Sequence, residues 1–149
     1  MDDHHPTTPR RPDDPYEGRE PKRYQNRLVV TEDDIDSLGH VNNIVYVRWI
    51  QDIAGEHWRS AADPEVAEGI AWVLTRHEID YKRAAHLGDE ITVTTWVGSA
   101  TKVRFERFVE ITGAADTLHA KSRTLWSPIN RATGRLVRLD ISAHEPFYE

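Results

Sequence analysis

Residues 44–59 carry a strong helical pattern of apolar positions. Apolar side chains recur every three or four residues, so that they stack on one face of a helix, which Trp49 and Ile53 widen. The members of this face are Ile44, Val47, Ile50, Ala54 and Trp58. Asn42 and Asn43 precede the run, and Asn is a good helix N-cap because its side-chain oxygen accepts a hydrogen bond from a first-turn amide. The pattern predicts a single long helix over these residues.

The opposite side of this helix is narrower and polar. Its members are Arg48, Asp52, Gly55, Glu56 and Arg59. Glu56 and its neighbour His57 are therefore expected to be solvated. Because the helix is apolar over most of its circumference, we expect other elements to wrap around it, and a curved sheet is the natural candidate.

The segments around the helix predict an antiparallel sheet. A polar connector over residues 61–69 leads into four strand-like runs, at residues 70–83, 89–99, 102–112 and 117–130. The links between these runs are short and rich in turn residues. Leu28-Val29-Val30 predicts a first strand before the helix, and residues 136–139 a last short strand or strand end. One helix between a first strand and an antiparallel meander indicates an α+β domain.

The first 22 residues differ in composition from the rest. They contain five prolines among Asp, Glu, Arg and Thr, with almost nothing to bury. We therefore expect a disordered, Pro-rich tail over residues 1–22 and a folded domain over residues 23–149. His4 and His5 are interpreted as solvated tail residues, because an ordered metal site needs three or four converging ligands. No metal site is predicted.

Composition restricts the class of protein further. A chain of 149 residues, with 38% hydrophobic and 30% charged residues, suits one globular domain. No apolar run approaches the ~20 residues that cross a bilayer, and the start lacks a signal-peptide pattern, so we expect a cytoplasmic protein without a membrane partner. The absence of cysteine excludes disulfides, a thiolate nucleophile and a Cys-based zinc site. A net charge of −6 argues against nucleic acid as the main partner.

The segment from Asp34 to Trp49 carries a recognisable motif. It reads Asp-x-Asp-x-x-Gly-His-Val-Asn-Asn-x-x-Tyr-x-x-Trp. This spacing resembles the signature of the hot-dog fold thioesterases, of the 4-hydroxybenzoyl-CoA and acyl-CoA/acyl-carrier-protein type. A second, weaker match is Ile79-Asp80-Tyr81-Lys82-Arg83, followed by Gly88-Asp89-Glu90. The resemblance covers about residues 23–139 and implies a hot-dog fold, in which a curved antiparallel sheet of about five to six strands wraps one long central helix.

The loop before the helix carries the candidate chemistry. Thioester hydrolysis needs a base or nucleophile and polarisation of the carbonyl oxygen. With no cysteine, and no serine in an elbow context, a carboxylate is the most available group. The unpaired amides of a helix N-terminus stabilise developing negative charge. Asp36 stands a few residues ahead of the predicted helix start.

The resemblance implies individual roles for these residues. In the 4-hydroxybenzoyl-CoA type, the catalytic carboxylate corresponds to Asp36, and the carbonyl-polarising amide is the backbone of Asn43. The hypothesis is that Asp36 attacks the thioester carbonyl or deprotonates a water, while the Asn43 amide stabilises the oxyanion. His40 would orient the water or Asp36. The plant acyl-carrier-protein type expects Asn and Glu where this chain has Leu38 and Ala84, so that set is incomplete.

Substrate contacts and assembly complete the predictions. Asn42 and Tyr46 are candidate substrate-binding residues, with capping and packing as competing roles. The phosphates of CoA need positive charge, and Arg83 and Arg104 are our candidates for binding them. No cofactor is expected beyond the CoA moiety of the substrate, and no glycine-rich phosphate loop is present. Hot-dog domains resemble one another in pairing through their sheets, so we expect a homodimer or a homotetramer built as a dimer of dimers.

The leading function is therefore an acyl-CoA thioesterase that releases a carboxylate and a free thiol. One alternative is a hydratase or dehydratase of acyl-thioesters, although its Asp-x-Asn-Pro-x-His motif is one residue longer than Asp36 to His40 and contains a Pro. A second is a non-catalytic acyl-thioester binding module. The acyl group, and the choice between CoA and acyl-carrier protein, stay open.

Overall fold

The computed structural model describes residues 14–149. Along the chain the main elements are β1 (Tyr24–Val29), α1 (Asn43–Ala61), α2 (Pro64–Gly69), β2 (Ile70–Tyr81), β3 (Glu90–Ala100), β4 (Phe105–Thr112) and β5 (Leu118–Asn130). Short 3-10 helices lie at Glu32–Asp34, Ala114–Asp116 and Ile141–Phe147. No helix within residues 14–149 is long and apolar enough to cross a bilayer.

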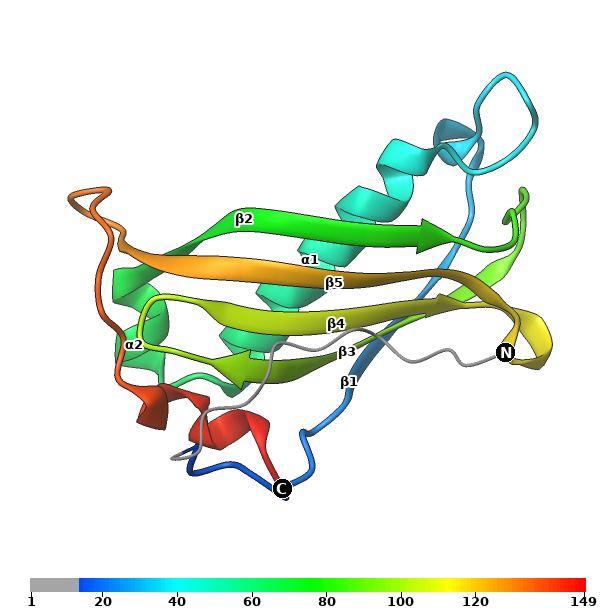
Figure 1. The fold of residues 1–149 in the computed structure, drawn as a ribbon. Coiled ribbons are helices and arrows are strands. Elements are labelled where there is room, and N and C mark those ends of the chain that lie inside the picture. The colour runs from blue at the N-terminus through cyan, green and yellow to red at the C-terminus, as the bar shows by residue number, and fades with distance from the viewer. Residues whose placement is uncertain (1–13) are drawn as a thin grey trace.

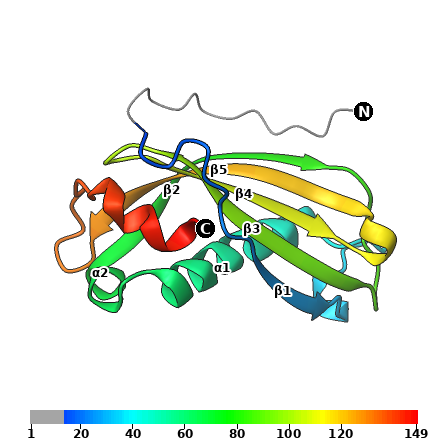
Figure 2. The same ribbon diagram turned by 90° about the horizontal axis from the view of Figure 1, so that it is seen from below.

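The strands form one five-stranded sheet in the order β1-β3-β4-β5-β2. Each neighbouring pair is antiparallel. The helix α1 runs along one face of the sheet, which curves around it (Figures 1 and 2). The predicted α+β architecture is confirmed. The segment 136–139 forms no strand, because only Leu136 makes an isolated bridge, to Ile129 of β5.

The helix α1 buries most of the face predicted for it, including Ile50, Ala54 and Trp58. Its buried side chains are Val45, Tyr46, Trp49, Ile50, Ile53, Ala54, His57 and Trp58. Ile44 is 75% exposed, and Val47 is only half-buried. The predicted position of Ile44 is wrong because it lies in the first turn, at the end of the helix, and Tyr46 is the residue that anchors this turn to the protein interior. His57, predicted to be solvated, is 3% exposed.

The protein interior contains two hydrophobic clusters. The larger one packs α1 against the sheet, and its members include Ile50, Ile53, Val93, Val109 and Ile111. The smaller cluster lies around the C-terminal end of α1 and brings together Tyr16, Trp58, Ala62, Val97, Phe147 and Tyr148. The segments on which Tyr16 and Tyr148 lie therefore meet beside the end of the central helix.

The packed structure begins before residue 23. The ring of Tyr16 stacks on that of Tyr148, with centroids 4.4 Å apart, and its hydroxyl donates to the Ile141 carbonyl over 2.8 Å. Of the predicted tail over residues 1–22, residues 1–13, with His4 and His5, lie outside the described residues. The remaining part packs against the C-terminal segment because Tyr16 supplies an aromatic ring that this segment buries.

Candidate active site

The loop between β1 and α1 is held in place by Asp34. This side chain is 7% exposed, and its Oδ2 accepts from the backbone N–H of Thr31 over 2.9 Å. Its Oδ1 accepts from Nη2 of Arg48 over 3.0 Å, which ties the loop to the helix. The Asp34 carbonyl accepts from the N–H of Asn42 over 2.9 Å. The first Asp of the motif is thus structural, and it positions the residues that follow.

Asp36 closes a tight turn. Its Oδ1 accepts from the N–H of Leu38 over 2.8 Å, and its own N–H donates to the His40 carbonyl over 2.9 Å. Gly39 has φ +79°, a conformation that favours glycine. Oδ2 of Asp36 accepts no hydrogen bond from any group in residues 14–149. The turn therefore fixes the carboxylate through one oxygen and leaves the other available.

The start of α1 offers an unused amide. Asn42 is the N-cap, and its Oδ1 accepts from the N–H of Ile44 over 3.0 Å. The N–H of Val45 donates to the Asn42 carbonyl over 2.9 Å. The N–H of Asn43 is the first of the helix, and within the described chain it has no acceptor. Because α1 is 19 residues long and carries no acidic residue in its first turn, this end retains the positive potential of the helix dipole.

These groups line one pocket of about 320 Å³, here called the Asp36 pocket. Its lining is Asp36, Leu38, His40, Val41, Asn42, Asn43, Tyr46, Tyr81, Lys82, Arg83, Ala84 and His119. Six of the seven residues predicted for the site are therefore brought together. Arg104 is the exception: it precedes β4 at the opposite end of that strand, roughly 23 Å away along the sheet.

The side chains of the Asp36 pocket are held in different ways. The Tyr46 hydroxyl accepts from the buried N–H of Ala85 over 3.1 Å, and burial raises the pKa of Tyr46. Tyr46 thus forms a fixed wall, as the competing packing interpretation has it. The Asn42 side chain is occupied by its cap. The His40 ring is exposed and meets the ring of His86 edge-on, with centroids 5.1 Å apart.

Sequence reasoning missed His119 of the pocket wall, and it assigned no site role to Tyr81 or Lys82, although both lie in the second motif. Tyr81, Lys82 and His119 come from the end of β2 and the start of β5. The Lys82 N–H donates to the His119 carbonyl over 2.8 Å. Only the antiparallel pairing of β2 with β5 brings His119 beside the second motif, so no local spacing indicated it. Within residues 14–149, no group of three or more His, Asp or Glu side chains is arranged to hold a metal ion.

A family model agrees with this geometry. The model described as "Thioesterase-like superfamily" matches residues 29–146. The chain belongs to the thioesterase-like superfamily. Both the predicted family and the prediction of a thioester hydrolase are confirmed by this match. A search of curated proteins gives no match.

Solved structures show the same fold as this thioesterase-like chain. A Staphylococcus aureus protein determined in complex with CoA is 20% identical, with a TM-score of 0.74 over 85% of this chain and 82% of its own. A 1,4-dihydroxy-2-naphthoyl-CoA thioesterase from Synechocystis is 23% identical, with a TM-score of 0.67 over 84% and 92%. A Thermus thermophilus thioesterase complexed with coenzyme A and Zn is 25% identical, with a TM-score of 0.72 over 83% and 95%. The predicted hot-dog fold is confirmed.

Proposed function

We propose that this thioesterase hydrolyses an acyl-CoA in the Asp36 pocket, with Asp36 as base or nucleophile and the Asn43 amide as the oxyanion donor. One observation carries the proposal. The pocket holds a carboxylate oxygen and a helix N-terminal N–H that are both unused by the described residues. These are the two groups that the attack on a thioester carbonyl requires.

The turn supports a chemical role for Asp36. Its Oδ1 is fixed by the Leu38 N–H, so Oδ2 points its lone pairs in a defined direction without side-chain reorganisation. A carboxylate held this way serves either as a base toward water or as a nucleophile. The charge that develops on the carbonyl oxygen is then stabilised by the Asn43 N–H and the helix dipole. The neighbouring His40 is exposed and free to orient the water or the carboxylate.

CoA is supported as the thiol by the solved structures of similar fold. Two of them were determined with CoA bound, and a third acts on 1,4-dihydroxy-2-naphthoyl-CoA. In this chain Lys82 and Arg83 line the Asp36 pocket and supply positive charge for phosphates. Arg104 lies too far along the sheet to share this task within one chain. The net charge of −6 argues against an acidic carrier protein as the thiol donor.

The proposal is tested by thiol release from a panel of acyl-CoAs. The chain has no cysteine, so a thiol reagent reports only the released CoA. The panel contains acetyl, hexanoyl, palmitoyl, benzoyl and naphthoyl thioesters. Asp36→Asn should lose about 10²–10⁴-fold in kcat. The matched control is Asp33→Asn, which removes the same charge from an exposed position of the same loop and should keep the wild-type rate.

Three results would refute the proposal. If Asp36→Asn hydrolysed the best thioester as fast as wild type, Asp36 would be neither the base nor the nucleophile. An absence of thiol release from every thioester, together with binding of one of them, would instead identify a non-catalytic binding module. If the protein added water to an enoyl-CoA, which the loss of enoyl absorbance would report, it would be a hydratase.

We also propose that the protein is a homodimer formed through β2. This strand is 12 residues long, lies at the edge of the sheet and has no neighbour on one side within the described chain. Long unpaired edges associate unless they are protected. Apolar side chains are exposed on β2 and beside the Asp36 pocket: Leu38, Ile44, Val73 and Tyr81. Sedimentation of the protein as a monomer at micromolar concentration would refute this; a dimer of dimers would appear in the same experiment.

A further inference from the structure

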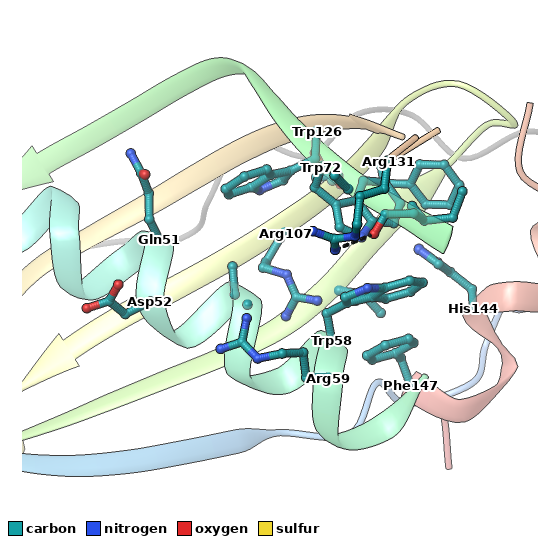
Figure 3. A pocket seen from close by; sticks show the side chains of 17 residues that line it. Gln51, Asp52, Trp58, Arg59, Trp72, Arg107, Trp126, Arg131, His144 and Phe147 are labelled. Atoms are coloured by element: carbon teal, nitrogen blue, oxygen red, sulfur yellow. Dashed lines mark hydrogen bonds between the residues drawn. The ribbon is translucent and has the colours of Figure 1, made fainter. Parts of the chain in front are cut away.

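A second cavity lies at the other end of the central helix, here called the Arg107 cavity. It has a volume of about 380 Å³ and lies between α1, β2, β4 and the C-terminal 3-10 helix Ile141–Phe147 (Figure 3). Five of the residues that line it carry large aromatic rings: Trp58, Trp72, Phe105, Trp126 and Phe147. It shares no lining residue with the Asp36 pocket. Gly55 in its wall is about 18 Å along the helix from Asn43, at 1.5 Å per residue.

Arg107 of β4 extends into this cavity toward the helix (Figure 3). The residue is 8% exposed. Its Nη1 donates to Nδ1 of His57 over 2.8 Å and to Oγ1 of Thr95 over 3.1 Å. Both acceptors are uncharged, because burial and the nearby Arg107 lower the pKa of His57 to about 3. Nε and Nη2 of Arg107 donate to no group in residues 14–149.

No carboxylate within the described chain neutralises Arg107. Burial lowers its pKa to about 10, so the guanidinium is still charged at neutral pH. Glu106 is adjacent in sequence, but its carboxylate pairs with Nε of Arg123 over 2.6 Å. Asp52 lies on the exposed side of the helix at the cavity rim. A buried charge without a counter-ion is costly, which suggests that an anion from outside completes the site.

The walls also contain two unused donors. The indole N–H groups of Trp58 and Trp72 are buried and have no acceptor within the described residues. That of Trp126, by contrast, donates to Oγ1 of Thr124 over 2.8 Å. These two nitrogens are shielded from the cavity as well as from solvent, so they do not define what the cavity binds. The guanidinium of Arg107 is the polar group that a ligand in the cavity would pair with, and the rings would contact an apolar body.

We propose that the Arg107 cavity binds a small monocarboxylic acid with a flat, apolar body. The carboxylate lies on the free edge of the Arg107 guanidinium, where it accepts two parallel hydrogen bonds. The apolar body lies among the rings of Trp58, Trp72 and Phe147, where ring contacts favour a planar group. A volume of about 380 Å³ is within the range of small-molecule pockets. This site does not depend on the proposed hydrolysis, because none of its residues belongs to the Asp36 pocket.

The first test measures affinity by titration calorimetry, with 1-naphthoate as the probe and neutral 1-naphthamide as its isostere. The acid should bind at least 10-fold more tightly than the amide. Arg107→Met should weaken the acid at least 10-fold and leave the amide unchanged. Arg138→Gln is the matched control, since it removes one exposed arginine charge outside the cavity, and it should bind like wild type.

The second test locates the probe by NMR, through the indole N–H signals of the five tryptophans in a proton–nitrogen correlation spectrum. Trp58 and Trp72 should shift on addition of 1-naphthoate. Trp96 should not, and neither should Trp49, whose ring packs on Tyr46 of the Asp36 pocket with centroids 5.5 Å apart. A shift of Trp49 alone would place the acid in the Asp36 pocket as a product and overturn the proposal.

A third variant keeps the proposal testable if Arg107→Met fails to fold. Gly55→Leu adds a side chain to the cavity wall, where the atoms nearest to its Cβ belong to the flexible end of Arg59. It should abolish binding of 1-naphthoate while the protein stays folded. The proposal would be overturned if the acid and the amide bound with equal affinity. It would also be overturned if the acid did not bind at 10 mM, or if Gly55→Leu bound it as tightly as wild type.

Discussion

Nδ1 of His57 on the central helix lies 2.8 Å from Nη1 of Arg107 on the sheet, and the pair is buried in the interior. Arg107 carries no lone pair, so the guanidinium donates and the imidazole accepts. His57 must therefore be neutral in the folded protein. Burial and the neighbouring Arg107 accordingly lower the pKa of His57 to about 3.

This pair predicts a specific loss of stability in mild acid. Unfolded His57 has a pKa near 6.5, so between pH 6.5 and 3 the unfolded chain binds one more proton than the folded chain at this residue. Stability is fully present above pH 6.5 and falls as pH decreases, by up to about 1.4 kcal/mol per pH unit. Urea unfolding at pH 4.5 to 7.0 measures the slope. His57→Gln, which keeps an acceptor for Arg107, should flatten it.

The carboxylates also titrate in this range, so a control is needed. His86→Gln changes an exposed histidine and should keep the wild-type slope. If His57→Gln loses stability with pH as steeply as wild type, the folded imidazole is not held neutral.

Tyr46 gives a second prediction, on stability alone. Its hydroxyl accepts from the buried N–H of Ala85 over 3.1 Å. Tyr46→Phe keeps the ring but leaves that N–H without an acceptor, so we expect a loss of about 1–3 kcal/mol in the free energy of unfolding. Denaturant unfolding measures it. Tyr81→Phe removes a hydroxyl that makes only a 3.4 Å exposed contact, with the Asn43 carbonyl, and should change little.

The N-cap gives a third prediction. Oδ1 of Asn42 accepts from the N–H of Ile44 over 3.0 Å, and it lies beside the amide proposed to polarise the substrate. Asn42→Ala should cost about 0.5–2 kcal/mol in unfolding free energy. Asn42→Asp keeps the cap and adds a negative charge near the developing oxyanion, so it should stay stable but hydrolyse more slowly. An Asn42→Asp variant with the wild-type rate would contradict the charge argument.

The extent to which sequence predicts this molecule depends on how local each interaction is. Asp36, His40 and Asn43 lie within eight residues, so their motif predicted one pocket, and the structure brings them together. Ile44 was misplaced because it lies in the first turn of α1, and apolar spacing does not tell how far along the helix the sheet extends. Lys82 and His119 meet only through strand pairing, which no spacing revealed.

Arg107 shows the same limit on the sheet. Its position alternates in phase with Phe105 and Val109, so the strand pattern places it on the face toward the helix. A charged residue there is normally excluded from the interior. What permits it is His57, 50 positions away in the sequence, together with Thr95 on the next strand. The Arg107 cavity could therefore not be predicted without the structure.

The oxyanion role of Asn43 can be tested by replacing it with proline, which has no backbone N–H. Asn43 is the first residue of α1, where proline is well tolerated because the N–H there has no partner in the helix. The preceding Asn42 has φ −63° and ψ 137°, the extended backbone that a following proline requires. Asn43→Pro should therefore keep the stability of the protein and lose about 10²–10³-fold in kcat.

The matched variant Asn43→Ala removes the side chain and keeps the amide. It should retain most of the rate, so the contrast between the two variants isolates the N–H from the side chain. Both rates come from the same thiol-release assay, with unfolding curves to compare stability. Both variants keep the carboxylate of Asp36. If Asn43→Pro hydrolysed as fast as wild type, another group would polarise the carbonyl oxygen, and the role of Asp36 would be unaffected.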